Sequence, residues 1–256
     1  MLPLGPQIFQ LDPWFITGFV DKKSFSSKRN CINNNLSLVV WGTNLRSSVA
    51  RGRITKQESN MIKLPFYPKS IIMGLLLSDG WLTMSKKESK NSRLGFKQSL
   101  DHSTYVWFVF NQLSHSRSTV LYYAPSGRAG KINYALGFFT RALPCFTELY
   151  YLFYVNKVKI IPGDIYNILT PVALAHLIMG DGSAQRHGLI ICTDSYKLVD
   201  IISLMNVLMI RYRLNCTVRV HNKSKYRIYI NQSSMALLVK IVSPYMHYSM
   251  LYKLNS

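Results

Sequence analysis

Two nearly uninterrupted apolar segments, each ending in Asp-Gly, constrain the fold of this chain more than any other feature. They read IMGLLLSDG at residues 72–80 and LAHLIMGDG at residues 174–182, which places their aspartates 102 residues apart. A helix that is apolar on all sides is buried on all sides, and a glycine directly after it is typical of a helix end. Gly74, Ser78 and Gly180 are small enough to let two helix backbones approach closely. The pattern predicts two buried helices that pack against each other.

The elements expected around these segments occur twice in the same order. The first copy predicts a buried helix at 70–77, strands at 81–84 and 93–99, a helix at 104–113, strands at 119–124 and 132–140, and a helix at 146–155. The second copy predicts a helix at 171–179, strands at 183–186 and 187–193, a helix at 196–212, strands at 216–221 and 226–230, and a helix at 235–245. This duplication predicts an α/β (α+β) fold with mixed sheets, built as two pseudo-symmetric αββαββα halves at 65–161 and 162–256.

The charge balance indicates a polyanionic partner. The chain has 31 Lys+Arg against 11 Asp+Glu, a formal net charge of +20, and the excess is spread over all three parts of the chain. With 48% hydrophobic and only 16% charged residues, the chain is not a disordered basic tail. A folded chain of this charge favours nucleic acid first and an anionic membrane surface second.

Other classes are excluded by what the sequence lacks. No apolar run approaches the roughly 18–20 residues that a membrane helix needs. The cysteines are too scattered for a CxxC metal site and too few for a disulfide framework, namely Cys31, Cys145, Cys192 and Cys216. We therefore expect them to be small buried residues.

Asp79 and Asp181 stand where a carboxylate is unfavourable. A negative charge at a helix C-terminus costs about 0.3–1 kcal/mol, and two such charges on packed helices repel each other. A divalent cation between them would remove both costs, and Mg²⁺ binds through one or two carboxylates together with phosphate oxygens. The alternative interpretation is that each Asp-Gly merely caps its helix.

These segments resemble the two motifs of a single-chain LAGLIDADG homing endonuclease, and the resemblance covers about residues 64–254. The tracts LTPVALAHLIMGDGS and SMLYKL are similar to members encoded in organellar group I introns. The resemblance implies sheets that form a DNA-binding saddle with the motif helices at the interface, a monomer, and location in the mitochondrion, although no targeting signal is visible. Leu77 and Met179 replace the first Asp of the family motif. His176 replaces a glycine and is expected to loosen the helix pair.

The resemblance also implies the site residues. Asp79 and Asp181, with Gly80 and Gly182 beside them, would hold Mg²⁺ or Mn²⁺ and cut one strand each of a double-stranded DNA target, leaving short 3′ overhangs. Further catalytic residues would be Gln98 in GFKQS, Lys159 in KIIP and Lys253 in YKL, with Thr193 at the place equivalent to Gln98. The alternative is that Gln98 is a strand residue and the two lysines are surface residues without a catalytic role.

The expected strands should carry the DNA-binding surface. Basic residues in or beside them are Lys86, Lys87, Arg93, Lys97, Arg128, Lys131, Arg186, Arg219, Lys223, Lys225 and Arg227. We expect most to contact phosphates or solvent rather than bases. The aromatic residues in helical patterns are expected in the core, namely Trp107, Phe108, Phe110, Tyr150, Tyr151 and Phe153.

Residues 1–64 are expected to be a poorly patterned extension. Within it, LDPWFITGFVDKKSF at 11–25 resembles a third, broken motif in which Lys23 and Ser24 replace the acidic residue and glycine. Our hypothesis is that residues 1–64 are a relic or leader that cleavage does not need. Two other functions stay open: an RNA maturase that binds its own intron RNA, and a non-catalytic nucleic-acid-binding protein.

Overall fold

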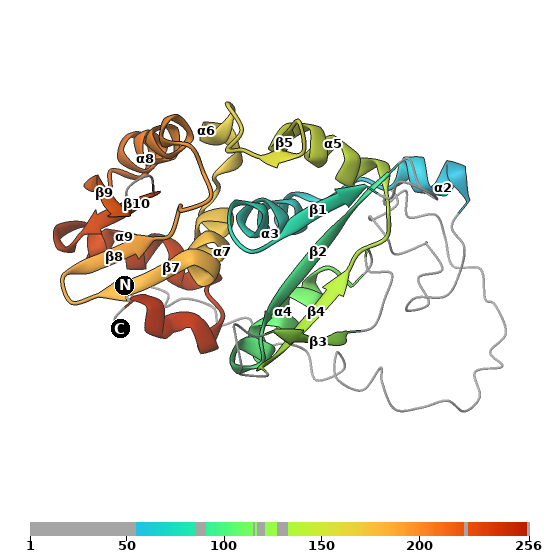
Figure 1. Ribbon diagram of the computed structural model, residues 1–256, viewed down its shortest axis with the longest axis horizontal. Helices are drawn as coiled ribbons and strands as arrows, with labels where there is room; N and C mark the ends of the chain where they lie inside the picture. Colours follow the sequence, from blue (N-terminus) through green and yellow to red (C-terminus); the bar gives the residue numbers. More distant parts are fainter. Residues whose placement is uncertain are drawn as a thin grey trace, which may run out of the picture. The chain divides into compact units, whose positions relative to one another are not determined.

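The computed structural model describes residues 55–84, 91–114, 116, 121–126, 133–222 and 225–254, which lie within one compact unit, residues 39–256 (Figure 1). Five of the expected DNA-binding residues lie outside the described residues: Lys86, Lys87, Arg128, Lys131 and Lys223. The broken motif at 11–25 does so too. None of the helices in the described ranges is long and apolar enough to cross a membrane.

The duplicated element order is confirmed. The first half contains α3 (Phe66–Leu77), β1 (Trp81–Met84), β2 (Ser92–Ser99), the 3₁₀ helix η1 (Leu100–His102), α4 (Ser103–Gln112), β3 (Tyr122–Ser126), β4 (Asn133–Phe139) and α5 (Pro144–Phe153). The second half contains α7 (Pro171–Asp181), β7 (Gly182–Gln185), β8 (Gly188–Ile191), α8 (Leu198–Tyr212), β9 (Cys216–Asn222), β10 (Lys225–Asn231), η2 (Gln232–Ser234) and α9 (Met235–Val242). The 3₁₀ helices η3 (Ser243–Tyr245) and η4 (Tyr248–Leu254) follow.

Each half forms one four-stranded sheet, with strand orders β1-β2-β4-β3 and β7-β8-β10-β9. The pairings between these strands are antiparallel, so the sheets are not mixed as expected. The reason is the path after the first hairpin: α4 carries the chain to the outer edge, where β3 pairs with β4, and β4 then lies beside β2. Helices α4 and α5 pack on the first sheet and α8 packs on the second.

The motif helices α3 and α7 pack side by side between the two sheets (Figure 1). A Cβ atom on Gly74 would lie 2.4 Å from the Ala173 carbonyl oxygen and 2.5 Å from His176 Cβ, and one on Gly180 would lie 2.5 Å from Ser78 Oγ. Each glycine therefore faces the residue that is equivalent to it in the other repeat. The expectation that His176 loosens the pair is wrong, because Gly74 provides the room that its side chain needs.

The imidazole of His176 is fully buried at this contact. Its Nδ1 lies 2.8 Å from the Tyr105 hydroxyl oxygen, and the two groups form a hydrogen bond. Burial, with a smaller contribution from His247, lowers the pKa of His176 to about 3, so the ring is neutral at ordinary pH. A neutral, hydrogen-bonded imidazole can replace a glycine in a core without burying a charge.

The structure differs locally from the elements expected from the sequence. The helix α2 (Lys56–Met61) lies in the expected extension, where Thr55 and Glu58 form a capping box. Ile62 after it is buried in the core, so the dispensable segment of our hypothesis cannot extend to residue 64. The helix expected to reach residue 155 ends at Phe153. There β5 (Tyr154–Val155) and β6 (Val158–Lys159) form a hairpin that precedes α6 (Ile165–Ile168).

The prediction for the helical aromatic residues is wrong in part. Phe110 and Phe153 are buried, but Trp107 is 51% exposed and Tyr151 is 71% exposed. Both lie on outward faces of the helices that cover the first sheet, where an amphipathic pattern alone cannot assign a large aromatic side chain.

The close helix contact gives a stability prediction. Gly74→Ala should lower the free energy of unfolding by about 1–3 kcal/mol, because its Cβ would overlap backbone that cannot move aside. Gly163→Ala is the matched control, since no atom lies within 4 Å of its added Cβ. Urea denaturation of both variants measures the difference. Equal midpoints for the two variants would contradict the tight contact.

Candidate metal and nucleic-acid site

The two aspartates lie where the motif helices meet, but in different local settings. Helix α7 ends at Asp181 itself, whereas α3 ends at Leu77, two residues before Asp79. Asp79 is exposed and Asp181 is partly buried. A Cβ atom on Gly180 would lie 3.1 Å from Asp79 Oδ2, so the first carboxylate stands next to the last turn of the second helix.

Two lysines cap the helix ends. Lys159 Nζ donates to the carbonyl oxygens of Ser78 and Gly80 at 2.8 and 2.9 Å. Lys253 Nζ donates to those of Met179 and Gly180 at 2.6 and 2.7 Å. An ammonium group at a helix C-terminus satisfies orphan carbonyls and offsets the negative end of the helix dipole. The glycines of the Asp-Gly pairs cap as well, since the Gly80 N–H donates to the Leu75 carbonyl oxygen at 2.7 Å and the Gly182 N–H to that of Ile178.

A cap between the halves was missed by the sequence analysis. The Tyr196 hydroxyl of the second half donates to the carbonyl oxygen of Leu77 at 3.0 Å and lies 3.4 Å from that of Leu76. These carbonyls belong to the last turn of α3, and no further helical turn follows to donate N–H hydrogen bonds to them. The sequence offers no signal for this contact, because the residues are 119 and 120 positions apart.

The electrostatics of the site disfavour a second negative charge, on Asp181, beside that of Asp79. Burial, with a smaller contribution from the nearby Asp79 charge, raises the pKa of Asp181 to about 7 against the opposing charges of Lys159 and Lys253. Burial also lowers the pKa of Lys159 to about 8, against the pull of both aspartates. Desolvation therefore outweighs the attraction between the lysine and aspartate charges here, and a bound cation would favour the ionised carboxyl.

The donor set fits Mg²⁺ or Mn²⁺ better than a metal that needs an all-protein cage. The described part of the chain contains no group of three or more His, Cys, Asp and Glu residues that could hold a metal ion. Two carboxylates that leave the remaining positions to water and phosphate oxygens match the usual binding of Mg²⁺. The Gly80 carbonyl already accepts from Lys159, which leaves the carboxylates as the main donors.

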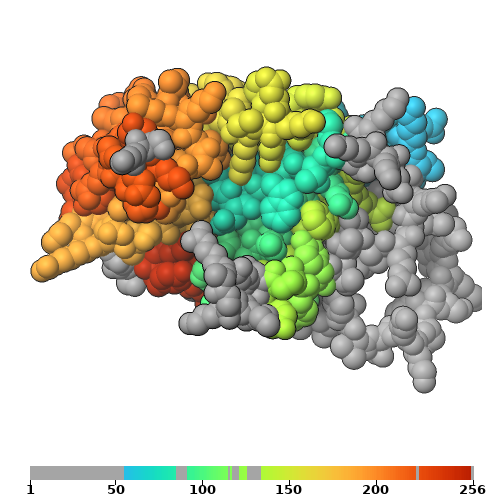
Figure 2. Space-filling model, in the orientation of Figure 1, coloured from blue at the N-terminus to red at the C-terminus, as the bar shows by residue number. Residues whose placement is uncertain are grey.

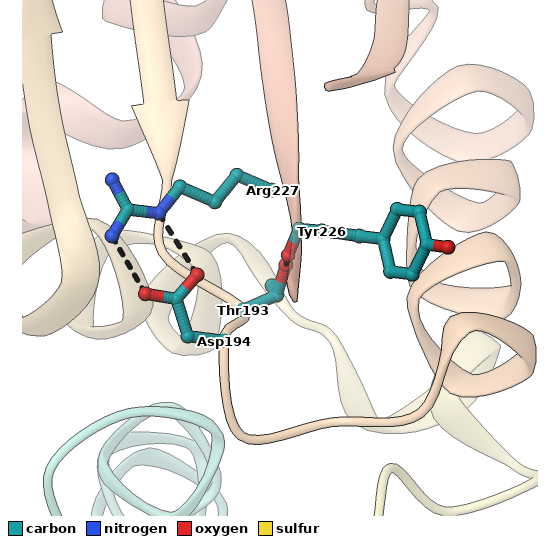
Figure 3. A network of polar contacts seen from close by, with 4 residues as sticks. All are labelled: Thr193, Asp194, Tyr226 and Arg227. Atoms are coloured by element: carbon teal, nitrogen blue, oxygen red, sulfur yellow. Dashed lines mark hydrogen bonds and ion pairs between the residues drawn. The ribbon is translucent and has the colours of Figure 1, made fainter. Parts of the chain in front are cut away.

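The two halves differ in the side chain that accompanies each aspartate. Gln98 Nε2 donates to Asp79 Oδ2 at 2.5 Å. Thr193, at the equivalent place, is almost fully buried and its hydroxyl donates to the Tyr226 carbonyl oxygen at 2.6 Å (Figure 3). The structure thus brings Gln98 to the first carboxylate, while the Thr193 hydroxyl is directed to the β10 backbone.

Asp194 is a further residue that the sequence analysis missed. It accepts hydrogen bonds from Arg227 Nε at 2.9 Å and from Arg227 Nη2 at 2.6 Å, which form a bidentate ion pair (Figure 3). The hydrogen bond from Arg227 lowers the pKa of Asp194. The sequence could have pointed to Asp194, because the chain has only 11 acidic residues and this one directly follows Thr193. The guanidinium of Arg227, an expected DNA-binding residue, is therefore held in a fixed orientation.

The remaining expected DNA-binding residues lie on the strands or their turns. Arg93 and Lys97 share one face of β2, where Lys97 lies across Gly137 and Arg93 Cζ lies 4.3 Å from the Phe139 ring centre. Arg219 pairs with Arg227 across β9 and β10, and its Cζ lies 3.3 Å from the Tyr229 ring centre. Arg186 lies in the β7–β8 turn and Lys225 begins β10.

The surfaces of the two halves meet on one face of the molecule. Figure 2 shows the β1–β2 region in teal and the β7–β8 region in light orange next to each other on the face shown. A guanidinium group over an aromatic ring is attracted to it by about 0.5–1 kcal/mol at an exposed site. Basic side chains held this way on both sheets can bind a polyanion that extends across the two halves.

The raised pKa of Asp181 gives a pH-dependent prediction. A carboxyl that holds its proton more tightly when folded contributes less stability as pH rises from its unfolded pKa of about 4 to its folded pKa of about 7. Asp181→Asn should therefore raise the Tm of the metal-free protein by about 3 °C or more at pH 8, and by less at pH 5. The exposed Asp164 offers the control Asp164→Asn, and a Tm gain that does not grow with pH would contradict the prediction.

Comparison with known proteins agrees with this geometry. The cytochrome b mRNA maturase bI2 of Saccharomyces cerevisiae is 33% identical over 73% of this chain and 47% of its own length. The protein of the same name from Debaryomyces hansenii is 30% identical over 73% of this chain and 72% of its own length. The intron-encoded endonuclease ai4 of Dictyostelium discoideum is 37% identical over 46% of this chain and 76% of its own length. The chain thus spans about half the length of the Saccharomyces relative.

A solved structure shares the fold. The homing endonuclease I-WcaI bound to its DNA recognition sequence matches with a TM-score of 0.72 and 24% identity, over 80% of this chain and 94% of that one. The model of the LAGLIDADG DNA endonuclease family matches residues 69–238, which include most of α3, all of α7 and both sheets. The chain therefore belongs to the LAGLIDADG DNA endonuclease family.

Proposed function

We propose that this chain is a site-specific DNA endonuclease that cuts both strands of a long, partly asymmetric target and promotes intron insertion. It would act as a monomer with pseudo-two-fold symmetry. We place it in the mitochondrion, and the relative named cytochrome b mRNA maturase bI2 supports this location. The observation that carries the proposal is the pair of carboxylates at the ends of two tightly packed helices, between two basic sheets. A pure binding protein has no need to hold two like charges together.

The residues of the site would divide the work. Asp79 and Asp181 would hold divalent cations, and the chemistry that a bound Mg²⁺ supplies is polarisation of the scissile phosphate and activation of water. Lys159 and Lys253 fix the helix ends from which the carboxylates project. The Gln98 amide, next to Asp79, is suited to orient a water or a phosphate oxygen.

The sharpest test is cleavage of a DNA library in Mg²⁺, followed by rates on the selected target. Asp79→Asn and Asp181→Asn should each lower cutting of one strand by about 100-fold or more, since several kcal/mol of charge stabilisation are lost. Chelation of the metal should abolish both cuts. Asp164→Asn is the control and should cut normally. Wild-type cutting by both site variants would contradict the proposal.

An RNA maturase is the second candidate, favoured by the two relatives named cytochrome b mRNA maturase bI2. A maturase stabilises folded intron RNA and does not need the two carboxylates for cutting. We expect the Asp79→Asn/Asp181→Asn double variant to keep full affinity for intron RNA in a filter-binding assay if this second function is present. RNA affinity no higher than for an unrelated RNA of equal length would exclude it.

A further inference from the structure

A chain of hydrogen bonds connects Asp79 with the C-terminal 3₁₀ helix of the other half. Gln98 Nε2 donates to Asp79 Oδ2 at 2.5 Å, Gln98 Oε1 lies 3.4 Å from His102 Nδ1, and His102 Nε2 lies 3.2 Å from the Tyr252 hydroxyl oxygen. The residues come from the loop after α3, from β2, from η1 and from η4. The sequence analysis assigned no role to His102 or Tyr252, which lie 150 positions apart.

The chemistry of these groups fixes the direction of every hydrogen bond. An ionised carboxylate only accepts, so the Gln98 amide presents its nitrogen to Asp79 and its oxygen to His102. The neutral imidazole must then carry its proton on Nδ1, which leaves Nε2 to accept from the Tyr252 hydroxyl. Burial lowers the pKa of His102 and Lys253 lowers it further, against Asp101 and Asp79, which favours the neutral ring.

We propose that His102 and Tyr252 are positioning residues that hold the Gln98 amide toward Asp79 and so support cutting of only the DNA strand that Asp79 serves. The inference rests on the proposed endonuclease function. The 3.4 Å contact between Gln98 and His102 is at the long end of hydrogen-bond distances. A ring held from both sides by Gln98 and Tyr252 can follow a small movement of the amide.

The second half offers Asp181 no comparable support from the described strands. The β2–β4 pairing continues to Ser99, opposite Ala135, whereas the β8–β10 pairing ends at Ile191, opposite Ile228. Thr193 therefore lies beyond the end of its strand, and its short side chain donates to the backbone of β10 (Figure 3). Support through a side-chain amide at this place is specific to the first half.

The helix η4 serves both centres with adjacent residues. Tyr252 contacts His102 of the first half, while Lys253 donates to two carbonyl oxygens at the end of α7. Packing of η4 against α4, α7 and β7 holds it in place. A variant that removes only the Tyr252 hydroxyl should therefore leave Lys253 and the second centre intact.

The first part of the test measures cutting of each strand separately. The target duplex selected in Mg²⁺ is labelled on one strand or the other, and the strand lost in Asp79→Asn identifies the first centre. His102→Ala should slow that strand about tenfold and leave the other within about twofold. His102→Asn retains a donor near the Nδ1 position and should recover most of the rate. Tyr252→Phe should slow the same strand, while the control Tyr151→Phe should change neither.

The second part is independent of metal, DNA and activity. Nitrogen-15 NMR of the metal-free protein should find His102 in the Nδ1–H form, and both Gln98→Ala and Tyr252→Phe should shift it toward the other tautomer. An Nε2–H form in the wild-type protein overturns the relay whatever the enzyme cuts. Equal slowing of both strands in His102→Ala, without rescue by His102→Asn, overturns it as well.

The two proposals fail in different ways. If the tautomer is as expected but Asp79→Asn cuts both strands normally, the endonuclease mechanism is wrong and the positioning role falls with it. If Asp79→Asn stops one strand and His102→Ala cuts both at the wild-type rate, the endonuclease function stands and only the relay is overturned.

Discussion

The close approach of the α3 and α7 backbones is the contact on which the rest of the structure depends. Helices that cross about a two-fold axis bring equivalent residues face to face, and here Gly74 faces His176 while Gly180 faces Ser78. Two side chains cannot share either place, but one glycine in each pair is enough. This explains how a bulky imidazole can occupy a motif position that is glycine in the family pattern. The constraint acts on the pair and not on each residue.

The same contact concentrates negative charge. It brings together two carboxylates and the negative ends of two helix dipoles, and it partly buries Asp181. Burial and, to a smaller extent, the Asp79 charge raise the pKa of Asp181. The Nζ atoms of Lys159 and Lys253 offset this charge through hydrogen bonds to backbone carbonyls. Because the ammonium groups bind the helix ends, they balance the field of the site while their hydrogen bonds leave carboxylate oxygens for a cation.

The helices, the strands and their duplication could be predicted from the sequence because they follow from local apolar patterns and Asp-Gly endings. The two-residue strands β5 and β6 could not, since they are too short to show a period and depend on left-handed backbone at Asn156 and Lys157. The partners of the site could be predicted least. The Arg227–Asp194 pair joins residues 33 positions apart and the Tyr196 cap joins residues 119 apart, so sequence distance conceals both. A resemblance supplied Gln98 and the two lysines, whereas Asp194 and Tyr196 matched no motif.

A shared fold therefore carries two different centres. Ser78 leaves helical geometry, with φ −118° and ψ −122°, whereas α7 continues through Asp181. Asp79 consequently lies beyond its helix and is exposed, while Asp181 stays on its helix and is partly buried. The lysines follow this difference, since one bonds the carbonyls of Ser78 and Gly80 and the other those of Met179 and Gly180. Because the fold requires only glycine complementarity and capped helix ends, the groups around each carboxylate are free to diverge, and they have done so.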